Sequence, residues 1–253
     1  LTLALTIRTH RLPTVTASES GSSGTITLSA AASDNVGVAK VEFYVDGVLK
    51  GTDTATPFSM NLASSTLANG SHSLVAKAYD AAGNVGSSST VSFSVNNAAT
   101  QLVVNGGFES GTGSWTASSG VITSDAGEAA HAGTWKAGMN GYGAAHTDTL
   151  YQQLTLPSTG TTFNLSFWLR VDSAETTTTN AYDTLKVQVR SSSGAVLATL
   201  ATYSNLNKGT SFVQKSFDLA AYKGQTVRIY FEGVEGSTVA TTFIVDDVSV
   251  TVQ

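Results

Sequence analysis

The chain has 253 residues with 18 acidic and 13 basic side chains, a formal net charge of −5, and no cysteine. The lack of cysteine excludes a disulfide framework, a thiolate metal site and a cysteine nucleophile. The excess of acidic side chains argues against nucleic acid as a partner, because phosphate binding needs a basic surface. No apolar run reaches the roughly 20 residues of a membrane-spanning helix, so we expect no membrane segment.

The rest of the composition indicates strands and turns. There are 36 threonines, 32 serines and 24 glycines, and only 12% of the residues are charged. β-Branched residues favour strands, and glycine and serine favour tight turns. Period-2 alternation dominates the chain, and we find no convincing helical stripe longer than about two turns. We therefore predict a secreted, extracellular all-β protein.

Residues 1–12 are interpreted separately from the rest of the chain. They start with Leu1 and carry no signal-peptide pattern, while apolar residues alternate with threonine and alanine. We interpret this stretch as a strand remnant of an upstream domain or as a tag, and the whole chain as a fragment of a longer precursor.

Residues 13–97 predict about seven short strands separated by regular turn signals. Phe43 and Val45 share one face of a strand, and Asp46-Gly47 then marks a tight hairpin turn. Short strands at this spacing predict an immunoglobulin-like β-sandwich.

Three segments of this block are similar to the bacterial Ig-like modules that are appended to secreted hydrolases. They are residues 32–38, 41–47 and 76–84, with the sequences ASDNVGV, VEFYVDG and AKAYDAAGN. The resemblance implies a bacterial Ig-like domain that acts as a spacer without chemistry of its own.

A short polar stretch, residues 96–100, separates this block from residues 101–253 and predicts a domain boundary. The second block predicts about ten strands, enough for two facing sheets, and therefore a jelly-roll β-sandwich. The predicted strands are residues 102–104, 121–124, 135–139, 149–156, 163–171, 184–191, 196–202, 212–219, 226–232 and 242–250.

Both ends of the second block resemble galactose-binding-like jelly rolls, a group that includes many carbohydrate-binding modules. Asn105–Glu109 (NGGFE) with Trp115 opens the block, and Phe243–Val250 (FIVDDVSV) closes it. The middle segments, residues 146–153 and 175–183, resemble the C-terminal jelly rolls of secreted bacterial peptidases of the subtilisin-like and sedolisin-like types.

Enzyme signatures are missing from the sequence. There is no Gly-x-Ser-x-Gly elbow, no His-Glu-x-x-His pair and no phosphate-binding loop. None of the four histidines is followed by another at metal-ligand spacing. We predict no catalytic residues, but the 18 acidic residues leave glycosidase-type carboxylate pairs open as an alternative.

The jelly-roll resemblance implies a structural calcium ion between the first and last strands. Carried over by position, Glu109 and Asp246 would be side-chain ligands, with backbone carbonyls near Gly107 and Lys136 completing the shell. If Val248 points inward, period 2 places Asp246 on the same face, where a carboxylate is costly unless paired or bound to metal. The alternative is that Glu109 and Asp246 lie in water or pair with Lys136.

A second metal or ligand site is considered at one end of the sandwich. Asp148, Glu175 and Asp183 each lie at the end of a predicted strand, and His146 shares a face with Asp148. The alternative is ordinary turn capping by Asp and Thr side chains.

Three strands of the second block alternate core residues with polar or aromatic ones. If these strands are neighbours, one exposed face carries rings and hydrogen-bonding groups for a ligand. The candidate ligand residues are Trp168, Arg170, Lys186, Gln188, Arg228 and Tyr230, with Arg190 and Glu232 on the same face. Tyr142, between two glycines, is a separate loop-tip candidate. The alternative is an ordinary wetted sheet face or an interdomain contact.

These observations favour a non-catalytic accessory region of a secreted bacterial hydrolase, more a peptidase than a glycosidase. The Ig-like domain would act as a spacer. The calcium-stabilised jelly roll would bind polysaccharide or an insoluble protein substrate, and the parent catalytic domain would be a further partner. We expect a monomer. One alternative is a structural or adhesive cell-surface segment without a small ligand, and another is an independent glycan-active enzyme.

Overall fold

The computed structural model describes residues 11–237 and 239–253, and the chain divides into two compact units between Ala98 and Ala99. The predicted upstream segment, residues 1–12, lies outside the described residues apart from its last two. The regular structure described is β-strand with three short 3-10 turns, which confirms the predicted all-β class. No helix among the described residues is long and apolar enough to cross a membrane.

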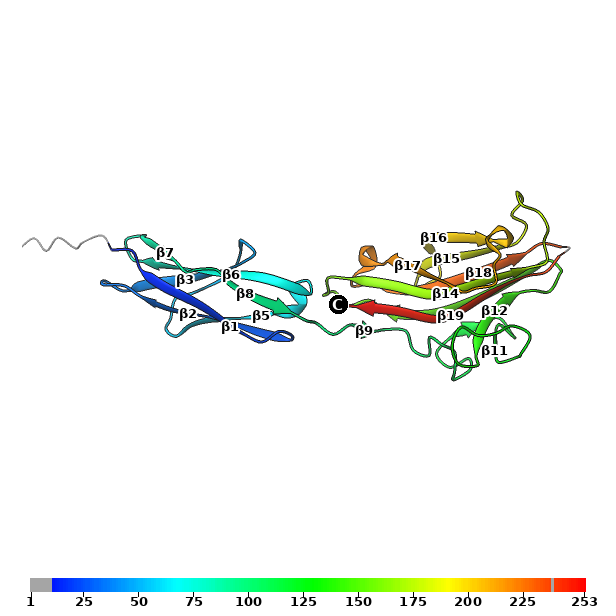
Figure 1. Ribbon diagram of the computed structural model, residues 1–253, viewed down its shortest axis with the longest axis horizontal. Coiled ribbons are helices and arrows are strands. Elements are labelled where there is room, and N and C mark those ends of the chain that lie inside the picture. The colour runs from blue at the N-terminus through cyan, green and yellow to red at the C-terminus, as the bar shows by residue number, and fades with distance from the viewer. Residues whose placement is uncertain (1–10, 238) are drawn as a thin grey trace, which may run out of the picture. The chain divides into compact units, whose positions relative to one another are not determined.

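The first unit is a sandwich of two antiparallel sheets (Figure 1). One sheet has the order β1-β2-β5, and the other has the order β4-β3-β6-β7 with β8 also pairing with β6. The bounds are β1 Thr14–Ser20, β2 Thr25–Ser33, β3 Val38–Val45, β4 Val48–Asp53, β5 Phe58–Ala63, β6 Gly70–Asp80, β7 Val85–Ser87 and β8 Val91–Val95, with a 3-10 turn at Ser64–Thr66. This arrangement confirms the predicted Ig-like sandwich.

Alternation explains the core of the first unit. Ile26, Leu28 and Phe43 are fully buried between the two sheets. The β3–β4 hairpin turns at Asp46 and Gly47, whose φ angles are 50° and 78°. Positive φ at both positions is what a two-residue type I′ turn requires, and Asp-Gly tolerates it.

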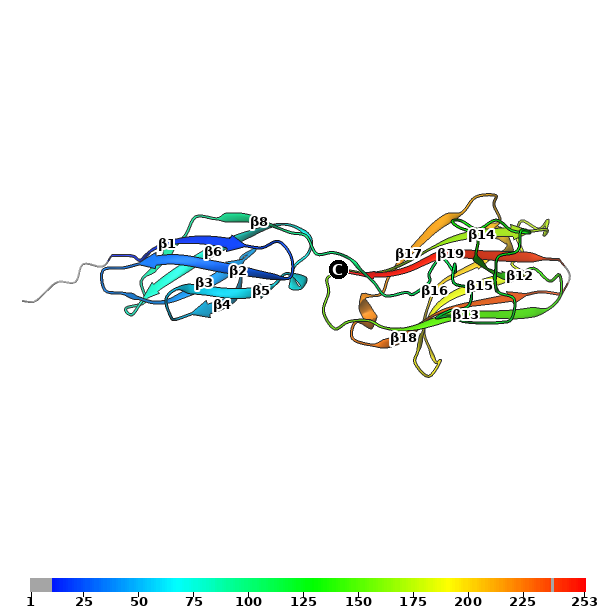
Figure 2. The same cartoon turned by 90° about the horizontal axis from the view of Figure 1, so that it is seen from below.

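The second unit is a jelly-roll sandwich, seen from two directions in Figures 1 and 2. One sheet, here the β13–β18 sheet, has the order β10-β13-β18-β15-β16. The other, the β14–β19 sheet, has the order β11-β12-β19-β14-β17, and β9 also pairs with β19. The bounds are β9 Thr100–Gln101, β10 Thr116–Ala117, β11 Ile122–Thr123, β12 Lys136–Asn140, β13 His146–Thr155, β14 Phe163–Ser173, β15 Thr184–Ser191, β16 Val196–Ser204, β17 Val213–Asp218, β18 Thr226–Glu235 and β19 Thr241–Val252, with 3-10 turns at Asn205–Asn207 and Ala220–Tyr222.

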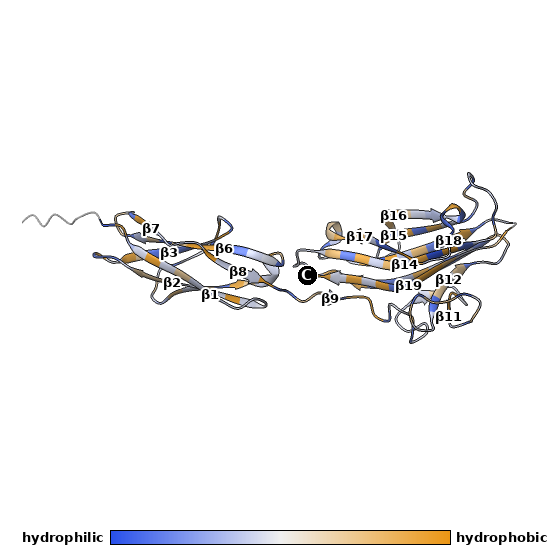
Figure 3. Cartoon of the chain, viewed as in Figure 1, coloured by the Kyte–Doolittle hydropathy of each residue, from blue (hydrophilic) through white to orange (hydrophobic). Residues whose placement is uncertain are grey.

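Alternation along the strands separates the core of this unit from two outer faces. Leu165, Phe167 and Leu169 of β14 point into the core, and Figure 3 shows the resulting bands of apolar and polar residues along the strand. Phe167 meets Phe231 of the opposite sheet edge to face, with ring centroids 5.1 Å apart. Burying such a side chain contributes roughly 1.5–3 kcal/mol, so the core holds the sheets together and leaves the outer faces to polar groups.

A bulge in β19 changes the side that its acidic residues face. The register between β14 and β19 shifts between Ser166 and Trp168 of β14, and Asp247 on the facing part of β19 has a φ of 48°. Val245 and Val248 both face the core, so two residues stand between them instead of one. Asp246 follows Val245 and therefore lies on the outer side of the β14–β19 sheet. The prediction that Asp246 shares the inner face with Val248 is wrong, because period 2 fails across a bulge.

Candidate functional site

The outer face of the β13–β18 sheet gathers tyrosine and charged side chains from three neighbouring strands. Tyr230 of β18 lies in register between Tyr151 of β13 and Gln188 of β15. The other members, in register across β15 and β18, are Lys186 with Glu232 and Arg190 with Arg228. We call these seven residues the tyrosine face.

The two tyrosine rings and one arginine form a row. The rings of Tyr151 and Tyr230 stack with centroids 5.3 Å apart and planes 12° apart. The guanidinium carbon of Arg190 lies 3.5 Å from the centroid of the Tyr230 ring. Because Arg190 and Tyr151 come from strands on opposite sides of β18, Tyr230 lies between them, and it is only 9% exposed. The ring faces are therefore occupied by protein, and the ring edges and polar tips are left for a ligand.

Hydrogen bonds fix the position of the Arg190 side chain. Its Nε donates to Gln188 Oε1 at 2.8 Å, and its Nη2 donates to Glu232 Oε2 at 2.7 Å. Lys186 Nζ lies 3.5 Å from Glu232 Oε1, and Gln188 Nε2 donates to Thr199 Oγ1 at 3.2 Å. A guanidinium held in this way offers its remaining N–H groups in a defined plane, which suits a ligand rich in hydroxyl groups.

The predicted ligand residues are split between the two sheets. Four of the six share the tyrosine face, but Trp168 and Arg170 lie on β14, whose neighbours are β17 and β19. The assumption that the three strands are neighbours is wrong, because alternation shows which residues share a side of a strand but not which sheet the strand joins. Tyr151 was not predicted, although its alternation with the buried Leu150 signals an outward position.

Trp168 and Arg170 belong to a cluster on the outer face of the β14–β19 sheet. Trp168 stacks on His131 with ring centroids 4.0 Å apart and planes 14° apart. Arg170 Nη2 donates to Asp172 and Glu128, each at 2.8 Å. Burial, together with the neighbouring Asp172, raises the pKa of Glu128 to about 7. The protein's own loop thus covers one face of the indole.

The predicted calcium ligands Glu109 and Asp246 hold one loop from two sides. Glu109 Oε1 accepts hydrogen bonds from the backbone N–H groups of residues 134–135, both at 2.8 Å. Asp246 is fully buried, and its Oδ2 accepts from the N–H groups of residues 131–132 at 2.8 and 3.2 Å. The two carboxylates therefore meet the same short segment, which we call the anchored loop (residues 131–135).

The donor set is compatible with calcium, which prefers oxygen ligands from carboxylates and carbonyls. Burial raises the pKa of Asp246 to about 6, and within the described residues no lysine or arginine forms an ion pair with it. Lys136 Nζ instead donates to the carbonyl of Asp125 at 2.5 Å and pairs with its carboxylate at 3.7 Å, so the predicted alternative, in which Lys136 pairs with Glu109 or Asp246, is not what the described residues show. A Cβ on Gly107 would lie 3.1 Å from a carboxylate oxygen of β19, which shows how closely this backbone approaches the acidic strand. The calcium ion stays a prediction.

The second predicted group is brought together in part. His146 Nε2 lies 3.2 Å from Oδ1 of the fully buried Asp148. Asp183, also fully buried, accepts a hydrogen bond from the Thr241 hydroxyl at 2.5 Å. The backbone carbonyl of Glu175 accepts a hydrogen bond from Lys208 Nζ. In the part of the chain that the structure describes, no group of three or more His, Asp or Glu side chains is placed to hold a metal ion. A metal or ligand here stays a prediction.

Family models of known domains match both units. A bacterial Ig domain matches residues 13–76, and a carbohydrate binding domain matches residues 100–238, which is more than half of the chain. This chain belongs to the carbohydrate-binding domain family. Both matches support the architecture expected from the sequence, an Ig-like domain followed by a carbohydrate-binding module. No curated protein matches the chain.

Several solved structures are similar to this chain. The carbohydrate-binding module TmCBM61, solved with β-1,4-galactotriose, is 14% identical, with a TM-score of 0.46 over 61% of this chain and 99% of that one. A structure of carbohydrate-binding modules from the β-sandwich superfamily is 14% identical, with a TM-score of 0.41 over 95% and 98%. The CBM22-1 xylan-binding domain of Paenibacillus barcinonensis Xyn10C is 15% identical, with a TM-score of 0.39 over 62% and 97%.

Proposed function

We propose that this chain is a non-catalytic accessory region of a secreted bacterial hydrolase and that its jelly roll binds polysaccharide on the tyrosine face. Membership of the carbohydrate-binding domain family supports glycan binding. The observation that carries the proposal is the fixed row of Arg190, Tyr230 and Tyr151 on an outer sheet face.

The chemistry of this face suits the hydroxyl groups of a glycan. Arg190 and Lys186 supply donors, and Glu232 supplies acceptors, all within one network across two adjacent strands. Neighbouring hydroxyls of a sugar both donate and accept hydrogen bonds, so alternating donors and acceptors can engage a pair of them. Hydrogen bonds to charged groups contribute about 1.5–3 kcal/mol each, enough for binding without a free ring face to stack on the sugar.

The remaining parts of the chain have supporting roles in this proposal. The Ig-like unit would space the module from a catalytic domain, and tethering would raise the local concentration of that domain on an insoluble substrate. The resemblance of residues 146–153 and 175–183 to peptidase-associated jelly rolls supports a peptidase as the parent. Calcium held by Glu109 and Asp246 would stabilise the anchored loop.

One observation favours a second function, a structural or adhesive segment without a small ligand. Tyr230 is only 9% exposed, and Arg190 already has two hydrogen-bond partners in the protein. A self-satisfied face of this kind also suits a stiff sheet that binds nothing.

Binding assays with the full chain separate the two functions. We expect the chain to be retarded in gels that contain soluble xylan, β-glucan or galactan, or to be retained on insoluble cellulose or chitin. Collagen is tested in the same way as an insoluble protein substrate. Arg190→Ala should weaken the interaction about ten- to a hundredfold, since it removes hydrogen bonds from a charged donor. Gln214→Ala, an exposed change on β17 of the other sheet, is the matched control. The proposal would be refuted if the chain bound none of these substrates, or if Arg190→Ala bound as tightly as the wild type.

A further inference from the structure

A cavity of about 400 Å³ lies on the other side of the sandwich, at the edge of the β14–β19 sheet where β11 and β12 lie. Its lining residues alternate along β12 and β19 with residues of the core, so it opens on the outer face of that sheet. Ligand pockets commonly have volumes of about 300–1,000 Å³, and this cavity is at the small end of that range.

The floor of the cavity is made by Gly138 and Thr242. Gly138 lies in the middle of β12, paired with Ile244 of β19. A Cβ on Gly138 would meet nothing closer than Thr242 Cγ2 at 3.9 Å, so the space above it is open. Glycine weakens a strand interior, and its presence there often marks a close approach by a ligand.

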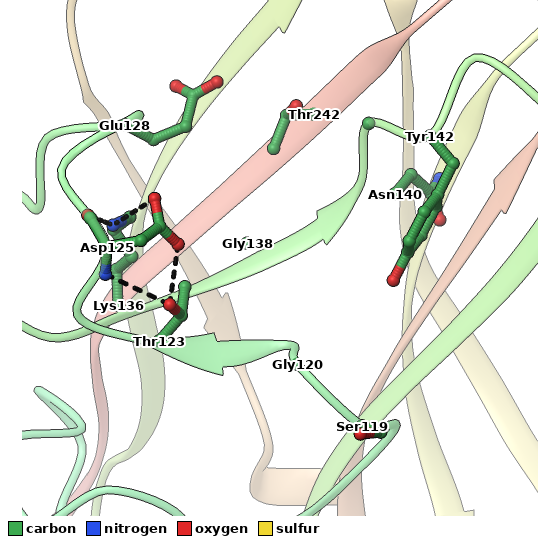
Figure 4. Close-up of a pocket in the computed structure, with 11 residues that line it drawn as sticks. Ser119, Gly120, Thr123, Asp125, Glu128, Lys136, Gly138, Asn140, Tyr142 and Thr242 are labelled. Atoms are coloured by element: carbon green, nitrogen blue, oxygen red, sulfur yellow. Dashed lines mark hydrogen bonds and ion pairs between the residues drawn. The ribbon is translucent and has the colours of Figure 1, made fainter.

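An aromatic ring forms one wall. Figure 4 shows Tyr142 on one side of Gly138 and the charged side chains on the other. Tyr142 is 51% exposed, its backbone N–H donates to Glu235 at 2.9 Å, and its ring packs on His146 with centroids 4.0 Å apart. Beside it, the amide of Asn140 is buried, and neither its oxygen nor its nitrogen has a hydrogen-bond partner among the described residues. This amide faces the opposite sheet and not the cavity, since a Cβ on Gly233 of β18 would lie 2.8 Å from Asn140 Oδ1.

Charged groups form the opposite wall. Lys136 is 1% exposed, and its Nζ donates to the Asp125 carbonyl at 2.5 Å and lies 3.7 Å from the Asp125 carboxylate. The Thr123 hydroxyl donates to the same carboxylate at 2.6 Å, which fixes its orientation. Glu128 adds a second carboxylate to this wall. The wall thus combines an ammonium group with carboxylate acceptors that are already oriented.

We propose that this cavity binds one sugar ring at the end of a glycan chain. The ring of Tyr142 would cover one face of the sugar, and Asp125 and Glu128 would bond its hydroxyls. The buried Lys136 would hold Asp125 in place, and Gly138 would let the sugar approach the strand. A small cavity with walls on two sides suits a terminal ring, whereas the tyrosine face is an open sheet surface for internal segments. The inference rests on the proposed function only in taking the ligand to be a glycan.

The two sites lie on opposite sheets of one sandwich, so one chain would hold two glycan segments at once. Linked binding events of this kind strengthen attachment beyond either site alone. The cavity and the tyrosine face share no residue, so each can be removed by substitution without touching the other.

The test is an NMR titration of the ¹⁵N-labelled full chain with glucose, galactose, xylose and N-acetylglucosamine at millimolar concentrations. We expect at least one monosaccharide to shift the amide signals of residues 119–123, 136–142 and 242. Gly138→Val should weaken this binding at least about tenfold, because its side chain fills the floor while valine suits a strand. Tyr142→Ala, a change at an exposed loop position, should weaken it as well. Arg190→Ala should leave it unchanged.

Other outcomes overturn the inference. It fails if no monosaccharide shifts these amides, if the shifts fall on β13, β15 and β18 instead, or if they persist at equal concentration in both Gly138→Val and Tyr142→Ala. Polysaccharide retention that depends on Arg190, without any monosaccharide shifting the amide signals around the cavity, would reject the inference and keep the proposed function. Monosaccharide binding in the cavity, together with polysaccharide retention that Arg190→Ala leaves unchanged, would keep the inference and reject the proposed function.

Discussion

Replacing Glu42 by glutamine should destabilise the first unit in a pH-dependent way. Glu42 on β3 accepts hydrogen bonds from Lys40 Nζ at 2.6 Å, Tyr44 Oη at 2.7 Å and Tyr79 Oη at 2.8 Å. These bonds, led by the one from Lys40, lower the pKa of Glu42 from 4.5 to about 2. Because the pKa is lower in the folded state, the stabilisation is present above pH 4.5 and is lost as the pH falls from 4.5 toward 2.

The size of the effect is set by this difference in pKa. Unscreened, it would correspond to about 3 kcal/mol above pH 4.5. The side chain of Lys40 is 39% exposed, so water screens the ion pair, and we expect Glu42→Gln to cost about 1–2 kcal/mol at pH 7. Tyr44→Phe removes one hydrogen-bond donor and keeps the charge, so it should cost less and leave the acid transition in place.

Denaturant unfolding at pH 7 and pH 3 measures this difference, and the chain supplies an internal control. Its three tryptophans, Trp115, Trp135 and Trp168, all lie in the second unit. Tryptophan fluorescence therefore reports the second unit, while far-UV circular dichroism reports both. A Glu42→Gln chain that is as stable as the wild type at pH 7, or that loses as much stability as the wild type on acidification, would refute the reasoning.

Three further predictions concern stability. If calcium binds between Glu109 and Asp246, excess chelator should lower the melting temperature of the wild type followed by tryptophan fluorescence, since an ion bound only by the folded state stabilises it. Asp246→Ala should not respond to chelator, and an unchanged wild-type curve would contradict an exchangeable site. Phe167→Ala should cost about 3–5 kcal/mol in the second unit by leaving a cavity against Phe231, and a loss below about 1 kcal/mol in urea unfolding, well under that range, would show that the site collapses. The hydrogen bond that His72 Nδ1 donates to the Asp46 carboxylate raises the pKa of His72 above 6.5. The contribution of His72 to stability is therefore complete below pH 6.5 and is lost as the pH rises through the raised value; His72→Asn should flatten that part of the stability curve measured by circular dichroism.

Much of the fold was predictable because alternation of apolar residues is a local property. Strand β14 and its core face are predicted by the alternating Leu165, Phe167 and Leu169. The Asp46-Gly47 pair predicts a hairpin because both residues tolerate a positive φ. These signals need only the nearest residues in the chain.

Sheet membership and bulges depend on distant residues, and there the predictions failed. Nothing near Trp168 shows that β14 joins β17 and β19, so it was placed on the wrong face. The extra residue at Asp247 appears only when β19 is set against β14, and it turns Asp246 outward. The cavity above Gly138 was missed for the same reason, because its walls come from segments that meet only in the folded chain.

The anchored loop is held through four of its peptide groups and through one side chain, His131, whose Nδ1 lies 2.6 Å from Asp247 Oδ2. The carboxylates of Glu109 and Asp246 accept hydrogen bonds from four main-chain N–H groups, which every residue type except proline supplies. The main-chain hydrogen bonds do not depend on the side chain at position 131, so an exchange there would give up only its contact with Asp247 and its stacking on Trp168. Variation there would remodel one outer surface of the module without disturbing the sandwich beneath, which makes this segment a natural place to engineer new recognition.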